Sequence, residues 1–286
     1  ESAPKVAIFA IDSRIRHWNR YINLSMSVVL SFDLAGRVAR LTLHRPEAKN
    51  ALRPEDWQQL TAHLVEIQRQ PQVRAILVTG TGGAFSSGGD LKTMPERLAL
   101  PISDRREQLV RDSKLIQTLY ELDLPVVAAI PGVCMGAGLS LALVCDLRVC
   151  ADTATFGAVF HRVGLSADFG LSWLLPQAVG SSKAMHMLMT AAVLSAEEAK
   201  TTGLVHSVVA ASELEKTALG WCEKLASGPK LAQAMTKRAL HRSATVDLET
   251  MLEWEAHSQS LLSKTADATE GVAAFLEKRP PVFRGN

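Results

Sequence analysis

The sequence predicts a layered α/β fold, in which repeated strand–loop–helix units form a core and a purely helical region follows. Short continuous apolar runs recur between residues 75 and 151, as in parallel strands that are covered on both faces. Segments with helical periodicity separate these runs. After about residue 180 the strand signal fades and helical segments succeed one another. Repeated units of this kind favour right-handed crossovers between parallel strands.

The first unit begins with two strands, at 28–34 and 38–43, on either side of a turn at Gly36. A polar loop at 45–50 leads to a helix that begins near Pro54, with acidic residues in its first turn. The apolar stripe of this helix has a 3.6-residue period: Trp57, Leu60, Leu64 and Ile67.

The order then repeats. We expect strands at 75–80, 125–130 and 147–151, a loop at 81–95, helices at 109–122 and from 139, and later helices at 182–190, 195–202, 213–226, 230–241 and 246–264. Ser195 with Glu197 and Glu198 is typical of a capped helix start. We divide the chain into a leader or extension outside the fold (1–26), a core (27–225) and a C-terminal helical region (226–286). A packed amphipathic helix is the alternative for the leader.

Composition excludes several classes of protein. The 286 residues include 31 Lys and Arg against 29 Asp and Glu, and 5% aromatics, so nucleic-acid binding is not expected. Apolar runs stay below the roughly 18 residues that cross a membrane. The four cysteines lie in apolar sequence without metal-ligand spacing, which favours buried thiols, a cytoplasmic location and no metal site: Cys134, Cys145, Cys150 and Cys222.

Two glycine-rich loops, at 82–91 and 131–138, each follow a buried-type strand and lead into a helix. Unpaired amides that converge from two such loops can hold a developing oxyanion. Tight turns for close strand–helix packing explain the same glycines equally well. Neither loop is a phosphate loop, because no Gly-Lys-Ser/Thr follows.

The motifs in these loops resemble those of the enoyl-CoA hydratase/isomerase (crotonase) superfamily over residues 27–284. The resemblance rests on ordered segments: Arg45-Pro46-Glu47-Ala48-Lys49-Asn50-Ala51-Leu52, Ala84-Phe85-Ser86-Ser87-Gly88-Gly89-Asp90-Leu91, Ala129 to Gly138, Cys145-Asp146-Leu147-Arg148, Leu194 to Ala199 with Gly203-Leu204-Val205, and Glu270 to Arg279.

This resemblance implies a crotonase-like ββα-repeat spiral core and an acyl-CoA thioester as substrate, with no other cofactor. It places the oxyanion-hole amides at Gly89 and Ala137. It also implies a homotrimer or a dimer of trimers, with the C-terminal helices between subunits. The positions that match the CoA contacts of the family are Arg45, Ala48, Ser87, Leu91, Phe275 and Lys278.

The acid–base positions depart from the hydratase pattern. Where hydratases of this family have two glutamates, this chain has Ser140 and Phe160. Asp168 remains, in a segment similar to the phenylacetate-pathway epoxyphenylacetyl-CoA isomerase branch, which also has Δ3–Δ2 enoyl-CoA isomerase activity. One carboxylate is sufficient to carry a proton from C2 to C4. Apolar neighbours would raise its pKa.

Alternatives remain at this stage. Asp168 could instead cap the helix after Gly170. His161 could line the pocket beside Phe160 or be structural. Besides an isomerase we consider a hydratase, a binding protein without chemistry, and a thioester hydrolase that uses water held by Ser140 or His161.

Overall fold

The computed structural model describes residues 27–286, and the predicted leader (1–26) lies outside the described residues. In this part of the chain the larger sheet has the order β1-β2-β3-β5-β7-β10 and the smaller one β4-β6-β8-β9. The pairs β1–β2 and β8–β9 are antiparallel and the others parallel. The strands are β1 (Val28–Asp33), β2 (Val38–Leu43), β3 (Ala75–Gly80), β4 (Ala84–Ser86), β5 (Val126–Ile130), β6 (Val133–Met135), β7 (Leu147–Ala151), β8 (Thr155–Gly157), β9 (Val193–Ser195) and β10 (Ser207–Val209).

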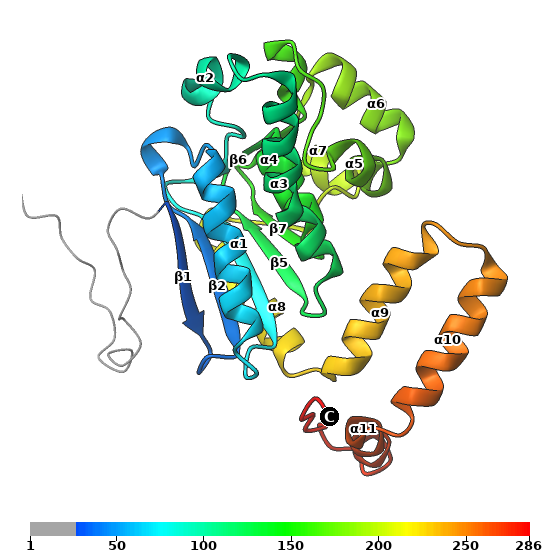
Figure 1. The fold of residues 1–286 in the computed structure, drawn as a ribbon. Coiled ribbons are helices and arrows are strands. Elements are labelled where there is room, and N and C mark those ends of the chain that lie inside the picture. Colours follow the sequence, from blue (N-terminus) through cyan, green and yellow to red (C-terminus); the bar gives the residue numbers. More distant parts are fainter. Residues whose placement is uncertain (1–26) are drawn as a thin grey trace, which may run out of the picture.

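The α/β repeat predicted from the sequence is confirmed. Strands β3, β5 and β7 of the larger sheet are each followed by a short strand of the smaller one, and helices then return the chain (Figure 1). The helices are α1 (Pro54–Gln68), α2 (Met94–Leu98), α3 (Ile102–Glu121), α4 (Ala137–Val144), α5 (Leu171–Val179), α6 (Ser181–Thr190), α7 (Ala196–Thr201), α8 (Leu214–Ala226), α9 (Lys230–Ser243), α10 (Leu248–Leu262) and α11 (Ala266–Leu276), with 3-10 turns η2 (Pro46–Ala48), η3 (Leu91–Thr93), η4 (Val159–Val163) and η5 (Ala211–Glu213).

Both faces of the larger sheet are buried, which explains its continuous apolar strands. Alternate residues of β3 separate to the two faces: Ile76 and Val78 join the main core with α1, α3 and α4, whereas Leu77 packs toward α8. Every residue of α4 is buried, as expected for a helix that is apolar all round. The start of this helix is therefore fixed rigidly within the core.

Several sequence-based boundaries were wrong. The expected loop at 81–95 contains β4, η3 and the start of α2, and the glycine-rich turn at 131–138 contains β6. Strands of three residues are too short to show a two-residue period, and β9 and β10 were missed for the same reason. Helix α3 begins at Ile102 rather than near Leu109, because its first turns are charged and mostly exposed and carry no apolar stripe.

Helices α9 and α10 project away from the sheets, and α11 lies at the end of the molecule opposite α2 (Figure 1). Lys237 on α9 ties this region to the core through an ion pair with Asp146, 2.9 Å between Nζ and Oδ2. We use "C-terminal apolar surface" for seven of the large exposed apolar side chains of this region: Leu240, Leu248, Leu252, Leu261, Val272, Phe275 and Leu276.

Candidate active site

The two glycine-rich loops pack directly against each other. Gly88 has φ of +99°, and a Cβ there would lie 2.9 Å from the carbonyl oxygen of Met135. A Cβ at Gly138 would lie 2.8 Å from the carbonyl oxygen of Ser86. Such contacts are tolerated only by glycine. The packing explanation for these glycines is therefore correct, and the close approach also brings the neighbouring amides of the two loops together.

The amides of Gly89 and Ala137 have no protein acceptor among the described residues. The carbonyl of Gly88 accepts a hydrogen bond from the Leu52 N–H (2.7 Å). In a trans peptide the N–H points opposite the carbonyl, so the Gly89 N–H points away from Leu52. The carbonyl of Gly136 accepts within α4 from the Ser140 N–H, which directs the Ala137 N–H out of the helix start. Both donors are thus free to bind a ligand oxygen.

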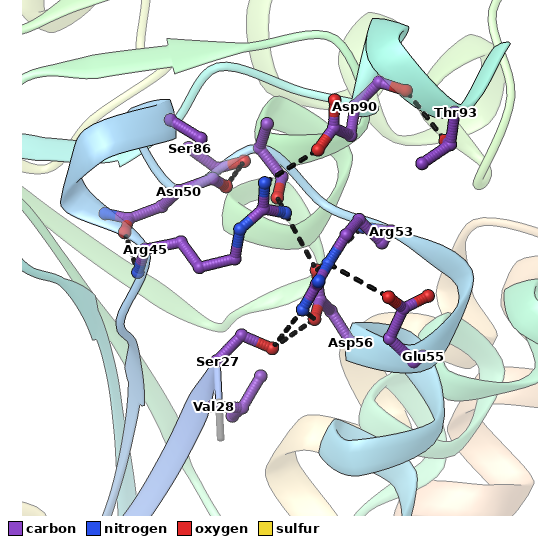
Figure 2. Close-up of polar contacts among 12 residues, drawn as sticks. Ser27, Val28, Arg45, Asn50, Arg53, Glu55, Asp56, Ser86, Asp90 and Thr93 are labelled. Carbon is purple, nitrogen blue, oxygen red and sulfur yellow. Dashed lines mark hydrogen bonds and ion pairs between the residues drawn. The ribbon is translucent and has the colours of Figure 1, made fainter. Parts of the chain in front are cut away.

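The first loop is held by a polar network (Figure 2). Arg45 donates from Nη2 to Oδ2 of Asp90 (2.7 Å) and from Nη1 to the carbonyl of Ala51 (2.9 Å). Burial opposes ionisation of Asp90, but the hydrogen bond from Arg45 and the N–H of Lys92 bring its pKa below the usual value. Asn50 donates to the carbonyls of Thr81 and Ala84. Arg45 therefore holds the loop directly after Gly89, through Asp90.

A cavity of about 110 Å³ lies where these loops meet α1, α2, α3 and the segment after η4. Of the predicted site residues it brings together six: Gly89, Ala137, Asp168, Ser87, Leu91 and Phe160. In the part of the chain that the structure describes, Asp168 is the one carboxylate among the lining residues. The walls are otherwise mostly apolar. A carboxylate thus shares one small cavity with two free amides.

Asp168 is partly buried, and its Oδ1 has no hydrogen-bond partner in the described structure. Burial raises its pKa to about 6, against the charges of Arg105 and Arg97, which lower it. The alternative role as a helix cap is wrong: α5 has Gly170 as its N-cap, with no side-chain cap. A free carboxylate with a raised pKa is suited to accept and return a proton near neutral pH.

The backbone around Asp168 is fixed by its neighbours. Its carbonyl accepts from Ser140 Oγ (3.2 Å) and from the Leu171 N–H (3.1 Å). Phe169, with φ of +49°, stacks on Trp57 with ring centroids 4.2 Å apart. These contacts hold the backbone of Asp168 in place.

The residues at the two hydratase glutamate positions have other roles. Ser140 is fully buried, its hydroxyl bonds backbone carbonyls, and it does not line the cavity. Phe160 lines the cavity with an apolar ring. Neither side chain can act as an acid or base near neutral pH.

Five predicted binding residues do not line this cavity. Arg45 acts through Asp90, as described above, and the Ala48 carbonyl accepts from Ser87 Oγ (3.3 Å). His161 is exposed, and its Nδ1 lies 3.2 Å from the carbonyl oxygen of Met189. Of its two expected roles, the structural one therefore fits this chain. Phe275, 83% exposed, lies on α11, and Lys278 follows that helix.

Sequence reasoning missed Arg97 and Arg105, which both line the cavity, and Trp57, which was assigned only to the core. Arg97 and Arg105 lie among other charged residues in the sequence, a pattern that is typical of a solvated helix surface.

The model of the family described as enoyl-CoA hydratase/isomerase matches residues 33–286. The chain belongs to this family. A probable enoyl-CoA hydratase of Rhodobacter capsulatus is 40% identical over 90% of this chain and 98% of that protein. The 1,2-epoxyphenylacetyl-CoA isomerase of Escherichia coli is 36% identical over 91% of this chain and 99% of that protein. A structure described as a putative enoyl-CoA hydratase/isomerase from Mycobacterium abscessus superposes with a TM-score of 0.86 at 36% identity, covering 91% of this chain and all of that one.

Another relative of this chain, the (E)-benzylidenesuccinyl-CoA hydratase of Thauera aromatica, is 35% identical over 90% of this chain and 99% of that protein.

Between residues 27 and 286, no three His, Cys, Asp or Glu side chains are grouped to hold a metal ion. In the same range no helix is both long and apolar enough to cross a bilayer. The four cysteines are buried and free, as predicted. The family membership and the crotonase-like fold expected from the motifs are thereby confirmed.

Proposed function

We propose that this enzyme isomerises an enoyl-CoA by moving the C3=C4 double bond to C2=C3. The observation that carries the proposal is the cavity in which Asp168 is the one carboxylate, with the free amides of Gly89 and Ala137. A proton shuttle needs a single carboxylate. Adding water across a double bond is served better by two, which hold and split the water.

The reaction balances with these three residues. The Asp168 carboxylate removes a proton from C2, and the electron pair moves into the thioester carbonyl. The amides of Gly89 and Ala137 stabilise the resulting oxyanion, and the dipole of α4 adds to the second donor. The dienolate then collapses, and Asp168 returns the proton to C4. No water enters and no bond to sulfur breaks.

We place the acyl group in the 110 Å³ cavity, with Ser87, Leu91 and Phe160 in its walls. The CoA portion would extend outside, toward the exposed edge at Leu91 (56% exposed). The CoA thioester is the substrate and no other cofactor is needed. Among the relatives, names divide between hydratase and isomerase, so hydration is the alternative function. The name of the Escherichia coli relative adds ring-epoxide esters to the candidate substrates.

We also propose that the protein is a homotrimer or a dimer of trimers. The C-terminal apolar surface exposes seven large side chains, which water disfavours and a subunit interface would bury. Phe275→Asp should lower the mass measured by sedimentation. Val65→Asp, at a 44% exposed position on α1, is the matched control that should leave the mass unchanged. A wild-type protein that sediments as a monomer would refute this assembly.

The test of function offers wild-type protein and Asp168→Asn the same two substrates, 3-hexenoyl-CoA and 2-hexenoyl-CoA. We expect wild type to convert the first into the second without change of mass, and the variant to lose at least about a hundredfold in rate. If wild type adds the mass of one water to 2-hexenoyl-CoA at a comparable rate, the enzyme is a hydratase. Release of free CoA would identify a thioester hydrolase. Binding of both esters without turnover would refute isomerisation of unsubstituted enoyl-CoA esters.

A further inference from the structure

Two arginines in the wall of the cavity have no carboxylate partner. Arg97 of α2 and Arg105 of α3 both line it, and within the described structure neither has a carboxylate oxygen within 4.0 Å. In the adjacent loop, Arg45 and Arg53 each hold at least one carboxylate within that distance. Within residues 27–286, both guanidinium groups that line the cavity are thus without a carboxylate ion pair.

Arg97 lies against the proposed oxyanion site. Its Nη2 is 3.7 Å from the position that a Cβ on Gly89 would take, and it contacts Met94 Sδ at 3.6 Å. Its Nε is buried and has no hydrogen-bond partner in the described residues. Burying such a donor unpaired costs free energy unless a ligand satisfies it.

The local charge is positive. Burial first, and then repulsion by Arg105, lowers the pKa of Arg97, although Asp168, Asp112 and Asp90 oppose this. Asp112 is itself engaged by Arg111 at 3.2 Å. The neutral partner of Arg105 is Gln108, whose Oε1 accepts from Nη1 at 2.7 Å. Two guanidinium groups therefore face one cavity that contains a single carboxylate, which leaves an excess of one positive charge.

We infer that the acyl group of the substrate carries a carboxylate of its own, in addition to the thioester, and that Arg97 and Arg105 bind this carboxylate. This deepens the proposed function, on which it rests. Guanidinium groups bind carboxylates through charge-assisted hydrogen bonds, and Arg97 has a free donor for one. Because Arg97 lies beside Gly89 and the cavity is small, only a few carbons of the acyl chain separate this carboxylate from the thioester.

The test measures binding rather than turnover, so it does not depend on the reaction. Saturated CoA esters with and without a terminal carboxylate are compared in pairs of equal chain length: succinyl with butanoyl, glutaryl with pentanoyl, and adipyl with hexanoyl. Isothermal titration gives the ratio of dissociation constants for each pair. We expect at least one carboxylated ester to bind wild type about tenfold or more tightly than its partner. In Arg97→Met and in Arg105→Met this ratio should fall toward one.

Arg106→Met is the matched control, because Arg106 is exposed, follows Arg105 on α3 and does not line the cavity. It should keep the wild-type ratio. Ratios near one for all pairs in wild type would overturn the inference, and so would a preference that both cavity variants retain. A carboxylate preference in a protein that isomerises nothing would refute only the proposed function. Isomerisation without the preference would refute only this inference.

Discussion

Replacing Asp168 by Asn should stabilise the protein while it abolishes isomerisation. The folded pKa of about 6 lies above the ordinary 3.8, so ionising Asp168 costs more in the folded state than in the unfolded one. This cost is absent below the unfolded pKa and grows as pH rises, until it levels off above the folded pKa. It amounts to at most about 3 kcal/mol at pH 8 and about half of that at pH 5.

Thermal unfolding of both proteins at equal concentration measures this difference. For a chain of this size, 3 kcal/mol corresponds to an increase in melting temperature of about 6–10 °C at pH 8, with a smaller increase at pH 5. Asp152→Asn neutralises an exposed carboxylate and is the control, with little change expected at either pH. An Asp168→Asn protein that melts at the wild-type temperature or lower at pH 8 would refute the reasoning, because Asp168 would then not be held at a cost.

Three further predictions concern the site. The kcat/KM for 3-hexenoyl-CoA should fall about tenfold per pH unit below about 6 and be level above it, since Asp168 must be ionised to accept the proton; a flat profile between pH 5 and 8 would exclude this base. Ala137→Pro removes one N–H at the first position of α4, where proline is tolerated, so the circular dichroism spectrum should be unchanged. We expect kcat to fall about 10²–10³-fold. An unimpaired kcat would exclude this amide as a donor. Arg45→Met leaves Asp90 without its ion pair and should lower the free energy of unfolding in urea by about 3–5 kcal/mol. The control Arg238→Met, at an exposed ion pair, should lower it by less than about 1 kcal/mol. Equal losses would show that the Arg45 network does not stabilise the loop.

The parts of the site that the sequence predicts are those set by local pattern. The two glycine-rich loops are recognisable because each lies between an apolar strand and a helix, and the resemblance to the family places the amides at Gly89 and Ala137. Asp168 stands out because the usual acidic positions hold Ser140 and Phe160. Backbone positions within short connections thus follow closely from sequence.

Features that depend on distant contacts were not predictable. Arg97 comes from the last turn of α2 and Arg105 from the charged first turn of α3, and only the tertiary fold brings both to the cavity that Asp168 lines. The three-residue strands β4 and β6 exist because they pair with each other, since such segments have little propensity of their own. Phe275 and Lys278 do not line the cavity of this chain, although the matching motif predicts CoA contacts at both positions.

The transferred hydrogen itself gives the most direct test of the central claim, that one carboxylate carries a proton from C2 to C4. Wild type and Asp168→Asn would each receive 3-hexenoyl-CoA labelled with deuterium at C2, in a single turnover. We expect wild type to remove deuterium from C2 as fast as it isomerises and to deliver part of it to C4, and the variant to do neither. Loss of the C2 label from the variant at the wild-type rate would contradict the account.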